Sequence, residues 1–244
     1  IASQGVVAAS IEDKNETMIE LYDKNGEELA KLKCSMDETG YPVDLALSPA
    51  GKLLAVSYLR MTGDAFVSSL AFYNFGEVGA NEIDNLVSGY DYENVIFPRI
   101  RFLDDSHAVA VGDSDVVFFS GSEKPVRGNA LKLNKNLESV FFGKEYMGLV
   151  YRAEKATGEW RLNVFDTVGE RVFQEDFDID YRDVLLENRQ AVIYNDRECM
   201  IYNLRGHIKF DGHLEDPALL MVATDSPTRF ALVSHDIAEL IRFK

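Results

Sequence analysis

The segment Asp176-Phe-Asp-Ile-Asp-Tyr-Arg-Asp183 places carboxylates at alternate positions, a spacing that could bind a metal ion. In an extended chain alternate side chains point to the same side, so Asp176, Asp178 and Asp180 would together present several oxygens to Ca²⁺. The segment lacks the Gly and the distal Glu of an EF-hand loop. An exposed strand edge explains the spacing as well. We therefore predict no resident cofactor, with Ca²⁺ as the one candidate ion.

The other residues that commonly do chemistry form no recognisable motif. The four histidines, His107, His207, His213 and His235, show neither metalloprotease nor His-x-His spacing. A nucleophile elbow, a phosphate-binding loop and a dinucleotide fingerprint are also absent from the sequence. Paired acids are plentiful, as a glycosidase needs, but any chain this acidic contains them. We predict no catalytic residues and no metal site.

Charge sets the class of partner that the chain can bind. Its 244 residues include 41 acidic and 25 basic side chains, for a net charge of −16. Nucleic-acid binding draws its affinity from Lys and Arg, so nucleic acid is excluded as a partner, and anionic lipid surfaces are disfavoured. Cationic ligands remain. The 46% hydrophobic share is that of a globular protein, and no apolar run approaches the length of a membrane span.

A repeated pattern shows which elements must position these side chains. Short runs rich in Val, Ile, Leu, Phe and Tyr end in an aromatic residue, and a polar turn that usually contains Gly follows. Alternation and turn residues of this kind predict β-strands. We call these residues the hallmark aromatics: Tyr22, Tyr73, Phe119, Phe165, Tyr202 and Phe243.

The hallmark aromatics recur about every 44 residues, which is the length of one four-stranded propeller blade. Two strands precede each hallmark strand and one usually follows it, so we label the strands of a unit a, b, c and d from the axis outward. The pattern predicts an all-β, WD40-like β-propeller of four-stranded antiparallel blades, with residues 1–244 as a single domain. An antiparallel sandwich is the alternative, but it requires no repeated aromatic.

The terminal units look incomplete. The first has no recognisable strand a and the last has no strand d, which leaves about five and a half blades and suggests missing N-terminal strands. Unpaired strand edges promote association, so we predict an incomplete ring or self-association through blade edges. The second unit also contains an insertion, in which a short helix is expected from Asn81 to about Gly89.

Placing the charges on this blade pattern assigns most of the acid to one face. The b-to-c and d-to-a connections emerge together and carry nearly all the excess negative charge, whereas the other face is almost neutral. Aromatic side chains beside carboxylates suit sugar, peptide or cationic ligands, although loop acids also serve solubility alone. The candidate ligand-binding residues are Tyr41, Asp64, Tyr92, Asp113, Asp115, Trp160, Asp176, Asp178, Asp180, Tyr181 and Asp196.

Two blocks of sequence, Gly40 to Leu59 and Phe72 to Asp84, resemble a family of unknown function from Gram-positive anaerobes, mostly clostridia. Members of that family look like membrane-anchored β-propeller proteins, with one transmembrane helix and an extracytoplasmic propeller. The resemblance implies that an anchor and further blades precede Ile1. It carries over no functional residues.

Together these features favour a non-catalytic binding or scaffolding module, extracytoplasmic and tethered to the membrane by a segment upstream of this chain. Its partner would be a protein, peptide or glycan, with a cationic one favoured by the charge. One alternative is a carbohydrate-active propeller enzyme, which needs two buried carboxylates about 5–10 Å apart. Another is a cytosolic WD-type scaffold, although the sequence has a single Trp and no repeated Trp-Asp signature.

Overall fold

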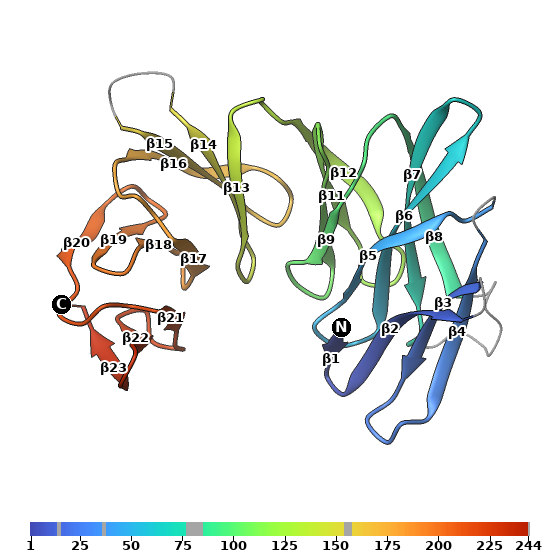
Figure 1. The fold of residues 1–244 in the computed structure, drawn as a ribbon, viewed down its shortest axis with the longest axis horizontal. Coiled ribbons are helices and arrows are strands. Elements are labelled where there is room, and N and C mark those ends of the chain that lie inside the picture. The colour runs from blue at the N-terminus through green and yellow to red at the C-terminus, as the bar shows by residue number, and fades with distance from the viewer. Residues whose placement is uncertain (14–15, 36–37, 77–84, 154–157, 244) are drawn as a thin grey trace. The chain divides into compact units, whose positions relative to one another are not determined.

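The structure is a computed structural model, and it describes residues 1–13, 16–35, 38–76, 85–153 and 158–243. Within these residues 23 strands form six antiparallel sheets, and strands that follow one another in the chain are neighbours in each sheet (Figure 1). The predicted series of four-stranded antiparallel sheets is therefore confirmed. The chain divides into two compact units, residues 1–134 with 167–169 and residues 135–166 with 170–244, and we describe each by itself.

The first unit holds three four-stranded sheets. Sheet 1 consists of β1 (Ala2–Ser3), β2 (Val6–Asp13), β3 (Glu16–Tyr22) and β4 (Glu28–Cys34). Sheet 2 consists of β5 (Tyr41–Leu47), β6 (Leu53–Thr62), β7 (Ala65–Asn74) and β8 (Leu86–Glu93). Sheet 3 consists of β9 (Arg99–Phe102), β10 (His107–Val111), β11 (Asp115–Ser120) and β12 (Val126–Lys132).

In the first unit one prediction was wrong and another was wrong only in where a helix ends. The first unit was predicted to lack strand a, but the two residues of β1 pair with β2 and form that strand. A strand of two residues is too short to give a periodic signal in the sequence. The expected helix is present at Asn85 but does not reach Gly89, because β8 begins at Leu86, while residues 81–84 lie outside the described part of the chain. Pairing with β7 decides the outcome, since β8 packs Val87 and Tyr90 against the hydrophobic core that sheet 2 shares with sheet 3.

The second unit holds two four-stranded sheets and one three-stranded sheet. Sheet 4 consists of β13 (Leu137–Phe142), β14 (Met147–Arg152), β15 (Trp160–Phe165) and β16 (Arg171–Phe177). Sheet 5 consists of β17 (Asp183–Glu187), β18 (Gln190–Tyr194), β19 (Glu198–Asn203) and β20 (Ile208–His213). Sheet 6 consists of β21 (Leu220–Ala223), β22 (Arg229–Val233) and β23 (Ala238–Arg242), so the last unit has strands a, b and c as predicted.

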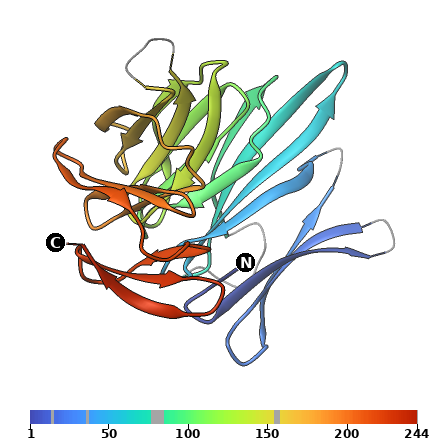
Figure 2. The same ribbon diagram turned by 60° about the vertical axis from the view of Figure 1, so that its left-hand side comes forward.

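The hydrophobic core lies between neighbouring sheets within each unit. Because side chains alternate along a strand, β18 directs Ala191 and Ile193 to the core shared with sheet 4, and Val192 and Tyr194 to the core shared with sheet 6. All four residues are buried. A strand covered on both faces must be apolar throughout, which explains why the b strands appear in the sequence as continuous apolar runs. Figure 2 shows the sheets as separate twisted ribbons.

The hallmark aromatics mark a shared backbone irregularity. In each four-stranded sheet the pairing of strand c with strand d shifts register at the end of strand c, at or just before the hallmark aromatic. In sheet 1, for example, Leu21 pairs with Ala30 but Tyr22 pairs with Glu28, so Leu29 has no partner. Such a β-bulge bends the outer strand and increases its twist.

Three of the turns that join strand c to strand d have the same geometry. Each begins with an Asx residue whose side-chain oxygen accepts a hydrogen bond from the backbone N–H four residues later, and a Gly with positive φ precedes that donor. The Asx residues are Asp23, Asp166 and Asn203, with bonds of 2.9, 2.9 and 3.0 Å, and the glycines are Gly26, Gly169 and Gly206.

Candidate functional site

The residues predicted to bind a ligand divide between the two units, with Tyr41, Asp64, Tyr92, Asp113 and Asp115 in the first. Tyr41, at the start of β5, and Asp64, in the β6–β7 turn, are exposed. The ring of Tyr92 in β8 packs against Phe97, with centroids 4.9 Å apart, and the Arg127 guanidinium lies 5.4 Å from its centroid. Tyr92 thus packs against the core between sheets 2 and 3.

The carboxylates next to β11 have partners within the protein. Asp115 lies 2.7 Å from Lys132 Nζ and accepts a hydrogen bond from the Ser114 hydroxyl. Burial acts to raise the pKa of Asp115, but the hydrogen bonds from Lys132 and Ser114 outweigh it and hold the pKa below its usual 3.8. Asp113 is exposed, and its Oδ1 accepts a hydrogen bond of 3.3 Å from the backbone N–H of Ile96.

In the second unit the structure brings two of the predicted residues together. The rings of Trp160 and Tyr181 meet edge to face with centroids 5.3 Å apart, and Phe141 and Phe177 also contact Tyr181. The Tyr181 hydroxyl lies 2.8 Å from Ser139 Oγ. Trp160 is only 9% exposed. Both rings therefore belong to the core between sheets 4 and 5.

The alternating carboxylates of the Asp176–Asp183 segment do not converge on one point. Asp176 forms a two-bonded ion pair with Arg161, at 2.6 Å to Nε and 2.9 Å to Nη2. Asp178 Oδ1 instead accepts a hydrogen bond of 2.8 Å from the backbone N–H of Glu159. The alternation ends because β16 stops at Phe177, so the following side chains no longer follow the strand's pleat.

Asp180 and Asp196 are exposed. Across the described ranges, no three His, Cys, Asp or Glu side chains gather as a metal site would require. Of the predicted ligand residues, Tyr92, Trp160 and Tyr181 are thus core components, while Asp115 and Asp176 are held in ion pairs. Ligand binding by the exposed members stays a prediction.

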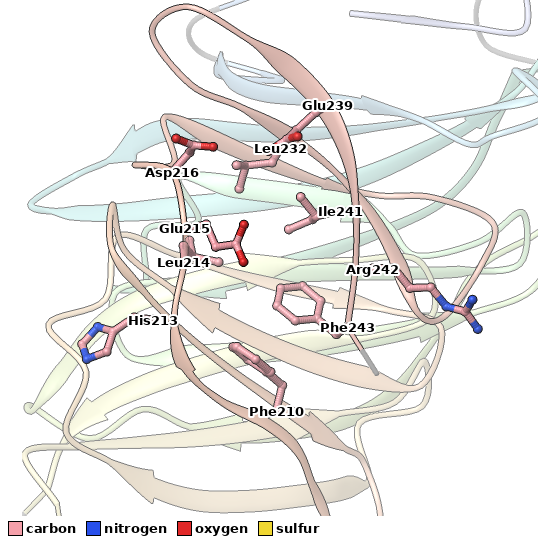
Figure 3. A pocket seen from close by; sticks show the side chains of 10 residues that line it. All are labelled: Phe210, His213, Leu214, Glu215, Asp216, Leu232, Glu239, Ile241, Arg242 and Phe243. Carbon is pink, nitrogen blue, oxygen red and sulfur yellow. The ribbon is translucent and has the colours of Figure 1, made fainter.

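A pocket of about 300 Å³ in the second unit combines aromatic rings with carboxylates (Figure 3). Phe210 of β20 and Phe243, just after β23, lie on one side of it with ring centroids 4.5 Å apart. Further lining residues are His213, Leu214, Glu215, Asp216, Leu232, Glu239, Ile241 and Arg242. We call this hollow the β20–β23 pocket.

The β20–β23 pocket is acidic. Glu215, Asp216 and Glu239 are exposed at its wall, and in the part of the chain that the structure describes none of them forms an ion pair. Figure 3 shows the Glu215 carboxylate directed inward, toward Ile241 and Phe243, whereas the Arg242 side chain extends away. Aromatic rings beside free carboxylates attract organic cations.

One edge of β23 is open next to this pocket. Ser234 N donates to Ile237 O and Phe243 N donates to Thr228 O, so the alternation of an antiparallel ladder turns residues 237, 239, 241 and 243 toward β22. The N–H and C=O groups of Ala238, Leu240 and Arg242 therefore face away from β22. No strand among the described residues pairs with them, and Leu240 is 69% exposed.

Sequence reasoning did not select this pocket. Phe243 was identified only as a hallmark aromatic, and Glu239, which lies in β23, precedes the last predicted strand, Leu240 to Phe243. The signal that pointed to the place was the missing strand d of the last unit, because a sheet without its outer strand leaves both an edge and part of a face uncovered.

Repeated four-stranded antiparallel sheets with apolar faces packed on one another define a β-propeller protein. Comparison with solved structures agrees. The chain superposes on the propeller domain of the Trilobed protease from Pyrococcus furiosus, which has an open velcro topology, with a TM-score of 0.57, 11% identity and coverage of 98% of this chain and 78% of that one. The chain also superposes on the WD40 domain of SCAP from fission yeast, with a TM-score of 0.58 and 12% identity. That match covers 98% of this chain and 64% of the SCAP chain.

The chain belongs to the family of unknown function DUF5711, whose sequence model matches residues 1–243. This confirms the resemblance to a family of unknown function, while its clostridial source and membrane anchor stay predictions. No curated protein matches the chain. No helix within the described ranges is long and apolar enough to cross a membrane.

Proposed function

We propose that this protein is a non-catalytic binding module that takes up an extended, basic polypeptide segment along β23. The observation that carries the proposal is the edge of β23 in the three-stranded sheet 6, with which no strand of the described residues pairs. An exposed strand edge is a template for strand addition, in which main-chain hydrogen bonds supply affinity and side-chain pockets supply specificity.

The β20–β23 pocket supports a basic partner. A strand added beside β23 would direct alternate side chains to the face that carries Glu239 and Ile241. A Lys or Arg at such a position would meet three carboxylates and the two phenylalanine rings. The net charge of −16 would also speed the approach of a cationic partner.

An exposed pocket suits binding better than glycoside hydrolysis. Hydrolysis needs a general acid whose carboxyl group is buried enough to hold its proton near neutral pH. Glu215, Asp216 and Glu239 are all exposed. By the family resemblance, we further propose that the module acts outside the cytoplasm, tethered to the cell membrane through another segment of the protein.

A peptide titration tests the binding mode. The probe is a short peptide of alternating Lys and Val, and its control has Glu in place of Lys. Leu240→Pro removes an outward-facing N–H without touching a bond to β22, whereas Leu240→Ala keeps that donor. We expect the Lys peptide to bind, Leu240→Pro to weaken binding at least about tenfold, and Leu240→Ala to weaken it less.

The charge requirement has its own variant. Glu215→Gln combined with Glu239→Gln should weaken the Lys peptide and reduce the salt dependence of its binding. Equal binding of the Lys and Glu peptides would overturn the basic preference, and equal binding by the Leu240→Pro and Leu240→Ala variants would overturn strand addition. A free protein that is dimeric as wild type and monomeric as Leu240→Pro would assign the edge to a second copy instead.

A further inference from the structure

A second pocket in the second unit has the opposite charge. It measures about 400 Å³ and lies where the turns of sheets 4 and 5 meet. Arg189 comes from the β17–β18 turn, Arg205 from the β19–β20 turn and Lys209 from β20. Asp166 is the one acidic residue in its lining. We call it the basic pocket.

The three cations of the basic pocket are available to a ligand. Arg189, Arg205 and Lys209 are exposed, and among the residues that the structure describes none of them has a carboxylate partner within ion-pair distance. Asp166 uses its Oδ1 to accept a hydrogen bond from the backbone N–H of Glu170. A pocket lined by three bases and one acid stands out in a chain with 41 acidic and 25 basic side chains.

The backbone holds Arg189 in a conformation that ordinary residues avoid. Glu187 pairs with Gln190, so Asn188 and Arg189 form a two-residue hairpin turn, with φ values of 53° and 58°. A turn with two positive φ values favours Gly at its second position, and Asn but not Arg tolerates the left-handed region easily. The strain persists because the Arg189 carbonyl accepts a hydrogen bond of 3.0 Å from Leu204 N. Strained residues of this kind gather at binding sites.

A β-bulge places the third cation. Ile201 pairs with Phe210 and Tyr202 with Ile208, so Lys209 is the unpaired bulge residue of sheet 5. The corresponding bulge residues of sheets 1, 2 and 4 are Leu29, Val87 and Val172. Bulges redirect side chains, and here the redirected side chain is basic.

We propose that the basic pocket binds a phosphoryl group. Two arginines and a lysine supply the planar, two-bonded donors and the point charge by which proteins hold phosphate oxygens. The volume exceeds that of a single phosphate, so the group belongs to a larger phosphorylated molecule. This site is separate from the β20–β23 pocket and does not depend on the function proposed for it.

Inorganic phosphate is the first probe, titrated calorimetrically into the full chain against sodium chloride of equal ionic strength. Short-chain polyphosphate is the second arm, and tighter binding of polyphosphate would indicate a polymeric source rather than a single phosphorylated molecule. Arg189→Gly should weaken phosphate binding at least about tenfold while raising the unfolding temperature, since Gly relieves the strained turn. Loss of binding in that variant would therefore not reflect unfolding.

Glu145→Gly is the matched control. Glu145 also has a positive φ, 65°, in the β13–β14 turn, so the substitution relieves backbone strain without removing a base. We expect this variant to be more stable and to bind phosphate as well as the wild type or more tightly. Wild-type affinity in both Arg189→Gly and Arg205→Gln would overturn the proposal, and so would a response to phosphate that chloride reproduces.

Discussion

The carboxylates of Asp115 and Asp176 are each bound by a cation from their own sheet. Asp115 pairs with Lys132 and Asp176 with Arg161. Both pairs cross from strand c to strand d at positions that lie opposite each other in the ladder. Cross-strand pairs of opposite charge stabilise a sheet. At these two residues the acid contributes to the fold, and a ligand would have to displace an internal partner.

The Asp115 pair should give the protein a pH-dependent stability. Its pKa is lowered in the folded state, so its contribution is complete above the usual value of 3.8 and is lost as the pH falls through the folded-state pKa. Asp115→Asn should reduce the free energy of unfolding by about 1 kcal/mol at pH 7, because Lys132 is exposed and its pairing is screened. Urea denaturation from pH 7 to pH 3 measures the difference.

The difference in unfolding free energy between wild type and Asp115→Asn should shrink as the pH falls below about 3.8. Asp64→Asn is the control. Asp64 is exposed, so this substitution removes one charge without breaking an ion pair of the described structure. A gap that stays constant down to the lowest pH would mean that the carboxylate contributes through packing and not through charge.

At the scale of strands and sheets, sheets 4 and 5 approach each other so closely at Gly143 that only a residue without a Cβ fits there. A Cβ on this residue, which follows β13, would overlap the carbonyl oxygen of Leu186 in β17. Gly143→Ala must therefore push sheets 4 and 5 apart locally. We expect a loss of about 1–3 kcal/mol in unfolding free energy, the usual cost of overpacking. Thermal unfolding followed by circular dichroism measures it.

Gly89→Ala is the matched control for Gly143→Ala. Gly89 lies in β8, and a Cβ there meets nothing within 4 Å. Ala lowers the entropy of the unfolded chain, so this variant should be neutral or slightly more stable. An equal loss of unfolding free energy in both variants would show that the backbone preference of Gly, rather than contact between blades, governs the outcome.

The strands were predictable because sequence period and tertiary role coincide. A buried b strand such as β18 is apolar from Ala191 to Tyr194, and each hallmark aromatic lies within one residue of the end of a c strand. The failures have local causes. β1 is too short for a period, and β8 satisfies a helical pattern over Leu86 and Val87 while its hydrogen bonds go to β7. Single-sequence patterns do not contain that long-range pairing.

The candidate site was less predictable, because a residue's loop position does not reveal which way its side chain points. Trp160 begins β15, where alternation places it on the same face as Leu162 and Val164, both buried. That parity could have assigned Trp160 to the core. The β20–β23 pocket depends on the approach of β20 to β23, and the basic pocket depends on a bulge, neither of which leaves a motif in the sequence.

For the whole molecule, the net charge of −16 should oppose compactness. Raising sodium chloride from low concentration to about 0.1 M shortens the Debye length from about 30 to 10 Å and screens repulsion among the acids. We expect the unfolding temperature to rise by about 2–4 °C. Near the isoelectric point of about 4.6 the same salt should have little effect. A fall in unfolding temperature on adding salt at neutral pH would show that ion pairs such as Arg161–Asp176 outweigh the repulsion.

The shared turn of sheets 1, 4 and 5 has a practical consequence. Asp23, Asp166 and Asn203 each begin a five-residue turn with one hydrogen-bond pattern, and each turn leads into a bulge that skips one residue. Turns whose flanking strands have the same geometry and register can replace one another. A recognition loop inserted into one of these turns can therefore be moved to another without re-engineering its flanks, which makes the chain a scaffold for displaying several copies of one peptide.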